Sequence, residues 1–250
     1  MAAVVEATVV AVQELSPSFK RITFAGCSQM SSGGYDQRIK ILLARPGQDG
    51  PRLPEESDWY GSWLAMPEDE RPIMRTFTIR SQDGPLVDIE FALHGDAGPA
   101  SAWARAARPG SKLGIIGPGI NDEINAVAYA PSEPDPEWHL LVGDDTAIPA
   151  IASILESLPP GAAAHVFVQV PHAGDVRDLP CAGRTQITWT IGHGLADAVR
   201  GAEFPTGNPY AWVAGESAVV RDVRRYLCSD RGWDSKSHYF GGYWKAGQPG

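Results

Sequence analysis

A proline-rich segment near the middle of the chain separates two stretches of different sequence pattern. The segment spans residues 130–138 and reads APSEPDPEW, which is typical of a linker. Before it, short runs rich in β-branched residues are separated by turn residues, whereas after it such runs alternate with helical patterns. The sequence therefore predicts two domains, over residues 1–130 and 137–250, joined by a linker over residues 131–136.

The first domain is predicted to be an antiparallel β-barrel. Its expected strands cover residues 7–15, 19–26, 38–47, 75–81, 86–95 and 111–119. A long loop interrupts them, rich in proline and acidic residues but also holding Trp59, Tyr60, Trp63 and Met66. Loops of this length in a compact domain are often functional. Its aromatic side chains either cover a ligand or pin the loop to the barrel, and the sequence leaves both open.

The second domain is predicted to be an α/β domain with a parallel sheet. The expected strands are residues 139–143, 164–170, 186–191, 210–215 and 237–244, and the expected helices are residues 146–158, 195–202 and 216–230. Alternating strands and helices imply a parallel sheet with ligands at the carboxyl ends of the strands. In the first helix, apolar residues at helical spacing are expected to form core: Ile148, Ile151, Ile154, Leu155 and Leu158.

The charge and cysteine content exclude several classes of function. With 21 basic and 30 acidic side chains the net charge is −9, which disfavours binding to nucleic acid or anionic membranes. The three cysteines fit a reduced compartment and exclude a four-thiolate metal or iron–sulfur site, and the scattered histidines favour no metal site. The apolar N-terminal stretch is too short to span a membrane. We expect a soluble, cytoplasmic monomer in which a local basic pocket binds any anionic ligand.

Residues 75–80, RTFTIR, form the first motif that indicates chemistry. On a strand, alternation places Arg75, Phe77 and Ile79 on one face and Thr76, Thr78 and Arg80 on the other. A guanidinium suits a bidentate grip on phosphate, a flat aromatic side chain can lie against a ring system, and a threonine can hydrogen-bond a ring nitrogen. The alternative is an amphipathic edge strand with an exposed arginine.

Residues 94–104, HGDAGPASAWA, form the second motif, at the end of a strand. Gly95 and Gly98 permit a tight turn and close approach of the backbone to a ligand. Pro99 is well suited to open a helix whose N–H groups face a phosphate. The motif therefore predicts a pyrophosphate cradle, and the alternative is a plain strand–turn–helix corner with His94 packed beneath it.

Three further stretches belong to the second domain. Residues 143–146, GDDT, follow the first strand at the usual nucleotide position of a parallel sheet, although the full G-x-G-x-x-G pattern is missing. Residues 215–217, GES, form another strand-to-helix turn. Residues 241–247, GGYWKAG, have glycines with no obvious packing requirement, so we expect that this stretch faces a ligand.

Taken together, these motifs are similar to those of the siderophore-interacting protein family, FAD-dependent ferric-siderophore reductases of the ferredoxin-reductase superfamily. The resemblance is nearly full-length and is carried by RTFTIR, HGDAGPASAWA, GDDTAIPA, AGE and GYWKAG in this order. It implies an N-terminal Greek-key β-barrel that binds FAD and a C-terminal α/β domain that binds NAD(P).

The resemblance also implies roles for individual residues. Arg75 would hold FAD phosphate, Phe77 would lie against the flavin, and Thr78 would reach its N5 edge. The other implied cofactor-binding residues are Thr76, His94, Gly98, Ala100 and Ser101 in the first domain and Asp144, Thr146 and Trp244 in the second. The ligand of the family is an anionic iron(III) chelate, so a basic pocket is expected, with the candidates Lys40, Arg45, Arg80 and Lys245.

Two positions depart from the family pattern. The family usually has tyrosine where Phe77 stands, so a hydroxyl contact to the cofactor is lost while stacking survives. The family often carries an arginine after the third α/β strand, whereas residues 189–193, WTIGH, have none. The donor is therefore left open between NADH, NADPH and reduced ferredoxin.

The function that the resemblance implies is reduction of ferric siderophores, in which electrons from NAD(P)H or ferredoxin pass through FAD to iron(III) and iron(II) is released. Such chemistry needs no acid–base residue from the protein, because the cofactor carries it. Two alternatives stay open: a general NAD(P)H:flavin or ferredoxin reductase, and a non-catalytic protein that binds ferric siderophores.

Overall fold

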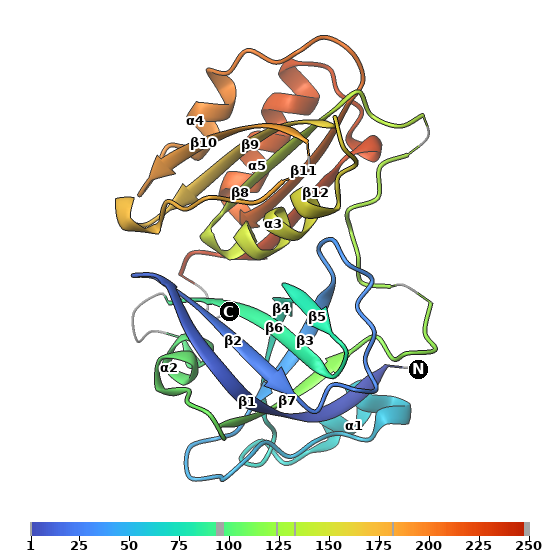
Figure 1. Cartoon of the computed structure of the whole chain (residues 1–250), viewed down its shortest axis with the longest axis vertical. Helices are drawn as coiled ribbons and strands as arrows, with labels where there is room; N and C mark the ends of the chain where they lie inside the picture. Colours follow the sequence, from blue (N-terminus) through green and yellow to red (C-terminus); the bar gives the residue numbers. More distant parts are fainter. Residues whose placement is uncertain (1, 94–97, 124, 133, 182, 248–250) are drawn as a thin grey trace. The chain divides into compact units, whose positions relative to one another are not determined.

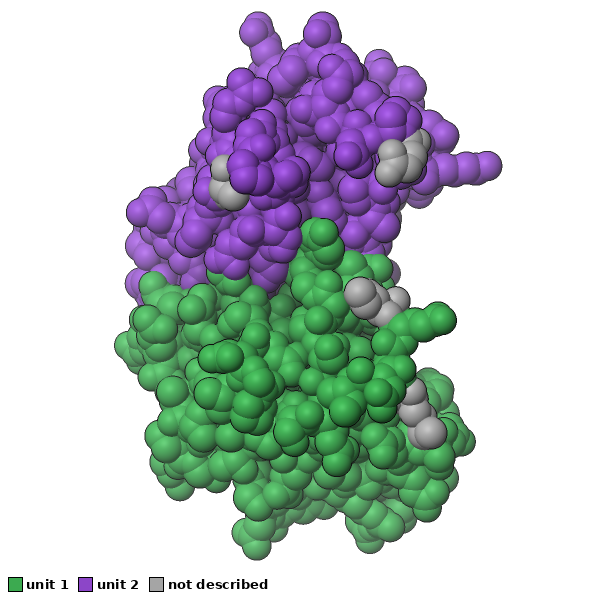
Figure 2. All heavy atoms as spheres, turned by 45° about the vertical axis from the view of Figure 1, so that its right-hand side comes forward, with its two compact units in different colours: residues 1–15, 19–127 green, residues 16–18, 128–250 purple. Residues whose placement is uncertain are grey.

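The computed structural model describes all residues except 1, 94–97, 124, 133, 182 and 248–250. It divides the chain into two compact units, which Figure 2 distinguishes by colour. The first unit comprises Met1–Leu15 and Phe19–Val127, and the second comprises Ser16–Ser18 and Ala128–Gly250. The division falls at residues 127–128, a few residues before the linker expected at 131–136.

The first unit is built on one antiparallel sheet of seven strands (Figure 1). They are β1 (Ala3–Ser16), β2 (Phe19–Ala25), β3 (Arg38–Leu43), β4 (Ile73–Thr78), β5 (Ser81–Asp83), β6 (Leu86–Ala92) and β7 (Lys112–Gly117). Their order across the sheet is β4-β3-β7-β1-β2-β6-β5. At each edge of the sheet, two strands that are consecutive in the chain lie side by side: β3 and β4 at one edge, β5 and β6 at the other.

This sheet curls, which confirms the expected barrel in a half-barrel form. The backbone N–H of Arg80, between β4 and β5, donates to the carbonyl of Asp88 on β6 at 2.9 Å, so the chain turns back across the sheet. Along β1, side chains alternate between the core and the outside, and Ala3, Val5, Ala7 and Val9 are buried. This period of two is what a sheet with one buried face requires.

The long loop of the first unit contains a helix that the sequence did not predict. Helix α1 (Trp59–Ala65) begins after Asp58, whose carboxylate accepts from the N–H of Gly61. Trp63 donates its indole N–H to the carbonyl of Pro72 at 3.0 Å, and the Arg71 guanidinium lies 5.3 Å from the centre of that ring. Trp63 therefore ties α1 to the end of the same loop, just before β4, and both interpretations of the loop aromatics stay open.

The second unit is built on a parallel sheet of five strands. They are β8 (Trp138–Asp144), β9 (Ala163–Val170), β10 (Arg184–Ile191), β11 (Pro209–Glu216) and β12 (Tyr239–Trp244), in the order β10-β9-β8-β11-β12. Its α-helices are α3 (Ile148–Ser157), α4 (Leu195–Arg200) and α5 (Ser217–Arg225), whereas α2 (Pro99–Ala106), like α1, belongs to the first unit. The predicted parallel sheet is confirmed.

Helices cover both faces of this sheet (Figure 1). Residues of α4 and α5 pack in one apolar cluster with Leu140, Val142 and Val213 of the sheet. On the opposite face, α3 buries the apolar stripe that the sequence predicted: Ile148, Ile151, Ile154 and Leu155, followed by Leu158. Among the described residues, the structure has no helix that is long and apolar enough to cross a membrane.

Candidate functional site

The RTFTIR motif lies mostly on β4, an edge strand whose neighbour in the sheet is β3. Register pairs Arg75 with Ile41 and Phe77 with Ile39, and both partners are buried in the core. Thr76 pairs with Lys40 and belongs to the other face. The predicted alternation is therefore confirmed for residues 75–78, whereas Ile79 and Arg80 lie beyond the strand and are both buried. At an edge strand, one approaching ligand can meet side chains of both faces.

The cations of β3 and β4 are only partly hydrated. Burial lowers the pKa of Arg75 below its ordinary value, and burial together with the nearby charge of Arg38 lowers the pKa of Lys40. Lys40 donates to the hydroxyl of Thr76 at 2.7 Å, and Arg75 donates to the carbonyl of Met74 at 2.8 Å. Within the described part of the chain, none of these three cations forms an ion pair.

Phe77 belongs to an aromatic cluster beneath the edge strand. Its ring centre lies 4.6 Å from that of Phe91, which is itself 5.8 Å from Trp103 of α2. Phe24 completes the cluster by stacking on Trp103 at 6.0 Å. Because Phe77 stays partly exposed while its neighbours hold the ring, it offers a fixed flat surface at this edge.

The second motif is described only in part, since His94 and residues 95–97 lie outside the described residues. Gly98 is the N-cap of α2 and has an extended backbone, with φ −125° and ψ 140°. A Cβ on Gly98 would meet no atom within 4 Å. Ala100 packs against the core and Ser101 is buried. The fold itself therefore does not require glycine here, whereas a ligand close to the backbone would.

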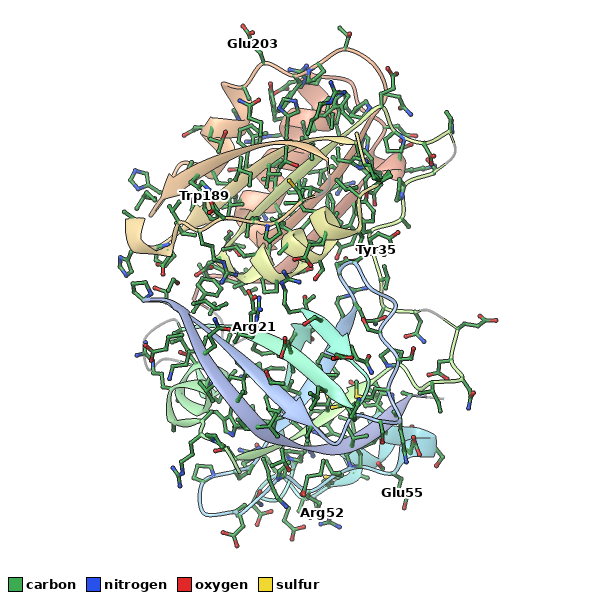
Figure 3. The ribbon with its side chains drawn as sticks, viewed as in Figure 1. Arg21, Tyr35, Arg52, Glu55, Trp189 and Glu203 are labelled. Atoms are coloured by element: carbon green, nitrogen blue, oxygen red, sulfur yellow. The ribbon has the colours of Figure 1, made fainter. Side chains whose placement is uncertain are left out.

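Two of the predicted substrate-binding cations take other roles. Arg45 lies beyond the end of β3 and donates to the carbonyl of Arg71 at 2.9 Å, and at about 3.3 Å per strand residue it is roughly 16 Å along the chain from Lys40. Arg80 is buried, with its Nε 3.5 Å from Oε1 of Glu90. Arg21 of β2, labelled in Figure 3, binds the same carboxylate at 2.7 Å.

A buried carboxylate next to Arg80 partly neutralises its positive charge. The sequence predicts Arg80 as a substrate-binding cation in a basic pocket, whereas the structure buries it and pairs it with Glu90. Lys40 remains as a partly buried cation on the outer face of β3, and Lys245, in the second unit, is exposed after the end of β12.

In the second unit, hydrogen bonds join all three predicted site residues through Asp144. Its Oδ1 accepts from the backbone N–H of Thr146 at 3.0 Å and from the Thr146 hydroxyl at 2.5 Å. Its Oδ2 accepts from the backbone N–H of Glu216 at 2.7 Å and from the indole N–H of Trp244 at 2.8 Å. Asp144 is only 6% exposed. One carboxylate thus connects the ends of β8, β11 and β12.

Sequence reasoning placed Glu216 in a strand-to-helix turn but gave it no role in this site. One oxygen of its carboxylate accepts from the N–H groups of Ala218 and Val219 at the start of α5, and the other accepts from Ala246. Burial acts to raise the pKa of Glu216, but these N–H donors lower it overall. An acidic residue just before a helix was the available signal, because such a side chain can cap the first turn.

Gly242 of the GGYWKAG stretch has a packing role, contrary to the prediction of no packing requirement. A Cβ on Gly242 would lie 2.5 Å from the hydroxyl oxygen of Ser217, the first residue of α5. That hydroxyl donates to the carbonyl of Trp244 at 2.8 Å. This part of the prediction was wrong because Gly242 lets β12 approach α5, a contact between residues far apart in the sequence, and the ligand-facing role stays a prediction.

Asp145, the neighbour of Asp144, is also buried. Burial is the main cause that raises its pKa to about 7, and the charges of Asp144 and Asp175 act in the same direction. The backbone N–H groups of Thr146 and Asp145 lower it. Near neutral pH this carboxyl group therefore exchanges a proton inside the α/β unit.

Comparisons with known proteins agree on one family. The family model described as siderophore-interacting FAD-binding domain matches residues 8–122, and the model described as siderophore-interacting protein matches residues 136–247. Ferric vibriobactin reductase ViuB of Vibrio cholerae is 33% identical over 248 residues, which cover 94% of this chain and 86% of ViuB.

Solved structures support the same assignment. The siderophore-interacting protein SipS from Aeromonas hydrophila has a TM-score of 0.79 at 32% identity, covering 99% of this chain and 92% of SipS. A siderophore utilization protein from T. fusca has a TM-score of 0.84 at 27% identity, covering 99% and 94%. A ferredoxin reductase of carbazole 1,9a-dioxygenase, at 14% identity and a TM-score of 0.69, shares the ferredoxin-reductase-like fold. The chain, with its FAD-binding unit followed by its α/β unit, belongs to the siderophore-interacting protein family.

Proposed function

We propose that this protein is an FAD-dependent reductase of ferric siderophores, with NAD(P)H or a reduced ferredoxin as electron donor. The observation that carries the proposal is the pair of strands β3 and β4 at the sheet edge, where Arg75 and Lys40 are partly buried cations that form no ion pair with any residue the structure describes, and Phe77 presents a flat ring. The family of the chain and its ferric-reductase relative support the same activity.

The residues of the first unit fit FAD. Burial removes water from around the Arg75 guanidinium and so disfavours its charged form. An anionic phosphate beside it would stabilise that charge in place of the lost water. Gly98 leaves open the space that a Cβ would fill, at the start of a helix where N–H groups suit a phosphate. We assign the phosphates to Arg75 and Gly98, with Ala100 and Ser101 beside them.

The ring of the cofactor is assigned to the β4 edge, with Phe77 against it and Thr76 and Thr78 at its polar edge. Phe77 is held from behind by Phe91, so the protein fixes the plane against which the ring rests. Bound FAD would take up electrons from the donor and deliver them one at a time to iron(III). His94 retains its proposed place beside the diphosphate.

The work left to the chain is to attract and orient the chelate. Lys40 and the adjacent Arg38 supply positive charge on the outer face of β3, which favours an anionic siderophore over a neutral one. Lys245 is the proposed cation of the second unit. No acid–base residue of the protein is required, because reduction to iron(II) alone weakens the bonds between the metal and hard oxygen ligands.

The donor is assigned to the α/β unit. Asp144, Thr146 and Trp244 lie at the carboxyl ends of parallel strands, where ligands of such sheets bind. A hydride donor or a one-electron protein donor would both fit the activity.

An anaerobic visible spectrum tests the proposal. The purified protein, supplied with FAD, should show a flavin spectrum that bleaches on addition of NADH, NADPH or reduced ferredoxin. Addition of a ferric siderophore with an iron(II) trap should restore the flavin spectrum as trapped iron(II) accumulates. If no flavin binds even when supplied, the assignment of Arg75, Phe77 and Gly98 is wrong.

The same assay separates the alternatives. A non-catalytic siderophore-binding protein would bind the chelate but yield no iron(II) with any donor. A general flavin or ferredoxin reductase would reduce free flavin and ferric chelate equally well when Lys40 and Lys245 are replaced by Ala. We expect instead that these variants lose chelate reduction and keep reduction of free flavin.

A further inference from the structure

Arginine is concentrated in one short stretch of the second unit. Residues 128–250 hold nine basic and fourteen acidic side chains, so this part of the chain is acidic as a whole. Yet four of its seven arginines fall within eleven residues, on α5 and in the segment that follows it: Arg221, Arg224, Arg225 and Arg231. All four are exposed. We call them the arginine patch.

The patch is more than a charge at the end of a helix. One face of α5 is buried against the sheet, and the spacing of Arg221, Arg224 and Arg225 places them together on the opposite face. Cations in the last turn of a helix interact favourably with its dipole, which accounts for Arg224 and Arg225. Arg221 lies in the middle of α5 and Arg231 lies beyond its end, so the dipole accounts for neither.

Aromatic rings support two of these guanidinium groups. The guanidinium of Arg224 lies 5.8 Å from the ring centre of Phe240, and that of Arg231 lies 5.0 Å from the ring centre of Phe204. Within the part of the chain that the structure describes, neither of them forms an ion pair, and nor does Arg221. A guanidinium that rests on a ring is held in place while its N–H groups can still meet a carboxylate of a partner.

The length of the patch indicates the kind of anion that fits it. Arg221 and Arg231 are ten residues apart along a helical stretch, or roughly 15 Å, so one small anion can reach only part of the patch. Aspartates lie between the arginines: Asp222, which pairs with Arg225 at 3.2 Å, and Asp230. These aspartates and the net charge of −9 disfavour nucleic acid or a membrane surface, whose negative charge is continuous. A folded protein with separate carboxylate groups matches the pattern.

The patch begins beside the edge of the sheet to which the electron donor is assigned. Helix α5 starts directly after β11. Burial raises the pKa of Glu216 at this edge, whereas backbone N–H donors and the charge of Arg221 lower it, so Arg221 lies close to the edge.

We propose that the arginine patch is the docking surface for a small acidic electron-transfer protein, an iron–sulfur protein such as ferredoxin, that serves as a reductant. This inference rests on the proposed function and adds a protein partner to it, and it leaves the binding of nicotinamide unchanged. Each docked partner is oxidised by one electron. Two successive dockings therefore reduce the flavin by two electrons with one proton from solvent, and two iron(III) ions are then reduced to iron(II) as the proton returns to solvent.

Calorimetric titration with oxidised [2Fe–2S] ferredoxin tests the docking without any redox step. The wild-type protein should bind ferredoxin at about 20 mM salt and at least about tenfold more weakly at about 200 mM. The double variant Arg221→Glu/Arg224→Glu should lose at least about tenfold in affinity at low salt. Arg221→Gln/Arg224→Gln, which removes charge without adding any, should lose less. Arg108→Glu/Arg184→Glu makes the same change of charge at two exposed positions outside the patch and should bind like the wild type.

Anaerobic mixing with reduced ferredoxin gives a second readout. The rate at which the bound flavin bleaches should fall in the same order as the affinities, whereas dithionite, which needs no docking, should reduce the flavin of every variant alike. Equal affinities of the Glu variant and its control would overturn the proposal. Patch-dependent binding of phosphatidylserine vesicles or duplex DNA, with no binding of ferredoxin, would overturn it too. Failure of the proposed function would look different, because the dithionite-reduced flavin would then pass no electrons to a ferric siderophore.

Discussion

In the β-rich unit, Arg75 and Lys40 hold positive charges that burial disfavours and that no carboxylate of the described chain balances. In the α/β unit, the Asp144 carboxylate is buried more deeply than these cations, yet four donors of the chain satisfy it. The first arrangement becomes more stable when an anion arrives, and the second is already complete. One unit is thus prepared for an anionic cofactor, whereas the other supplies its own anion.

The difference has an energetic consequence. A partly desolvated cation gains stability from a bound anion, so FAD should stabilise the first unit by mass action. A carboxylate with all its hydrogen bonds made by the chain contributes to folding in the absence of any ligand. Four substitutions test this contrast, in order of decreasing expected effect.

The largest effect is expected for Gly215→Ala. The new Cβ would meet the Asp144 carboxylate at 2.6 Å and would sit on a backbone with φ +136°. Strain of this kind and lost hydrogen bonds to a charged group together cost about 4 kcal/mol of unfolding free energy. Gly232→Ala is the matched control, because Gly232 has a φ of +76° with no atom within 4 Å of the new Cβ. Urea unfolding of the full chain should separate the two, and equal losses would contradict a backbone built around Asp144.

Asp145→Asn should reveal a pH-dependent cost in the same unit. The folded state raises the pKa of Asp145 from 3.8 to about 7, so the native protein keeps a proton that the unfolded chain releases. The contribution of Asp145 to wild-type stability is therefore greatest below pH 4. It decreases as the pH rises from about 4 to about 7.

Because asparagine does not titrate, the variant should gain stability relative to the wild type across this window, by up to about 4 kcal/mol at pH 8. Unfolding free energies measured at several pH values check the prediction. Asp197→Asn, at an exposed position, should follow the wild-type profile. If the unfolding free energies of Asp145→Asn and the wild type changed with pH in the same way, the pKa of Asp145 would not be raised in the native state.

Arg75→Ala should weaken FAD binding by about 2 kcal/mol, or roughly thirtyfold, because a charge-assisted hydrogen bond to phosphate is lost. Arg52→Ala removes the same charge from an exposed pair with Glu70 in the long loop, where Figure 3 labels it. Fluorescence titration should give Arg52→Ala the same affinity for FAD as the wild type. Equal affinities for both variants would show that Arg75 does not contact the cofactor.

Phe77→Tyr should give the smallest change. The family usually has tyrosine at this position, and the added hydroxyl would supply one more hydrogen bond to the cofactor, worth about 1 kcal/mol or less. FAD affinity should rise a few-fold while the ring keeps its contact with Phe91. A fall in affinity would indicate that the Phe77 ring edge faces the core instead of the cofactor.

Features with a short sequence period could be predicted. The faces of β4 and the apolar stripe of α3 follow from alternation by two and by 3.6 residues, and the structure confirms both. The three-residue strand β5 and helix α1 were missed. The first is too short to show a period, and the second is seven residues long and contains a glycine.

The arrangement of the α/β site could not be derived from local pattern. Asp144 binds Glu216 and Trp244, which lie 72 and 100 residues further along the chain. Resemblance to the family placed Trp244 and Asp144 in the same site, but only the structure shows that the Asp144 carboxylate accepts the indole N–H of Trp244. Arg80 was misread for a similar reason, since its partner Glu90 lies on β6, and pairing of strands decides which charges meet.

The bond between Asp144 and Trp244 also bears on how the protein matures. During synthesis β8, β9 and β10 emerge together and can pair early, yet β8 has no neighbour on its other side until β11 is made. Until residue 244 has left the ribosome, the donor from β12 is missing and the carboxylate faces solvent on that side. The hydrogen bond between Asp144 and Trp244 therefore closes a loop of 100 residues and can form only after the last strand of the sheet is made.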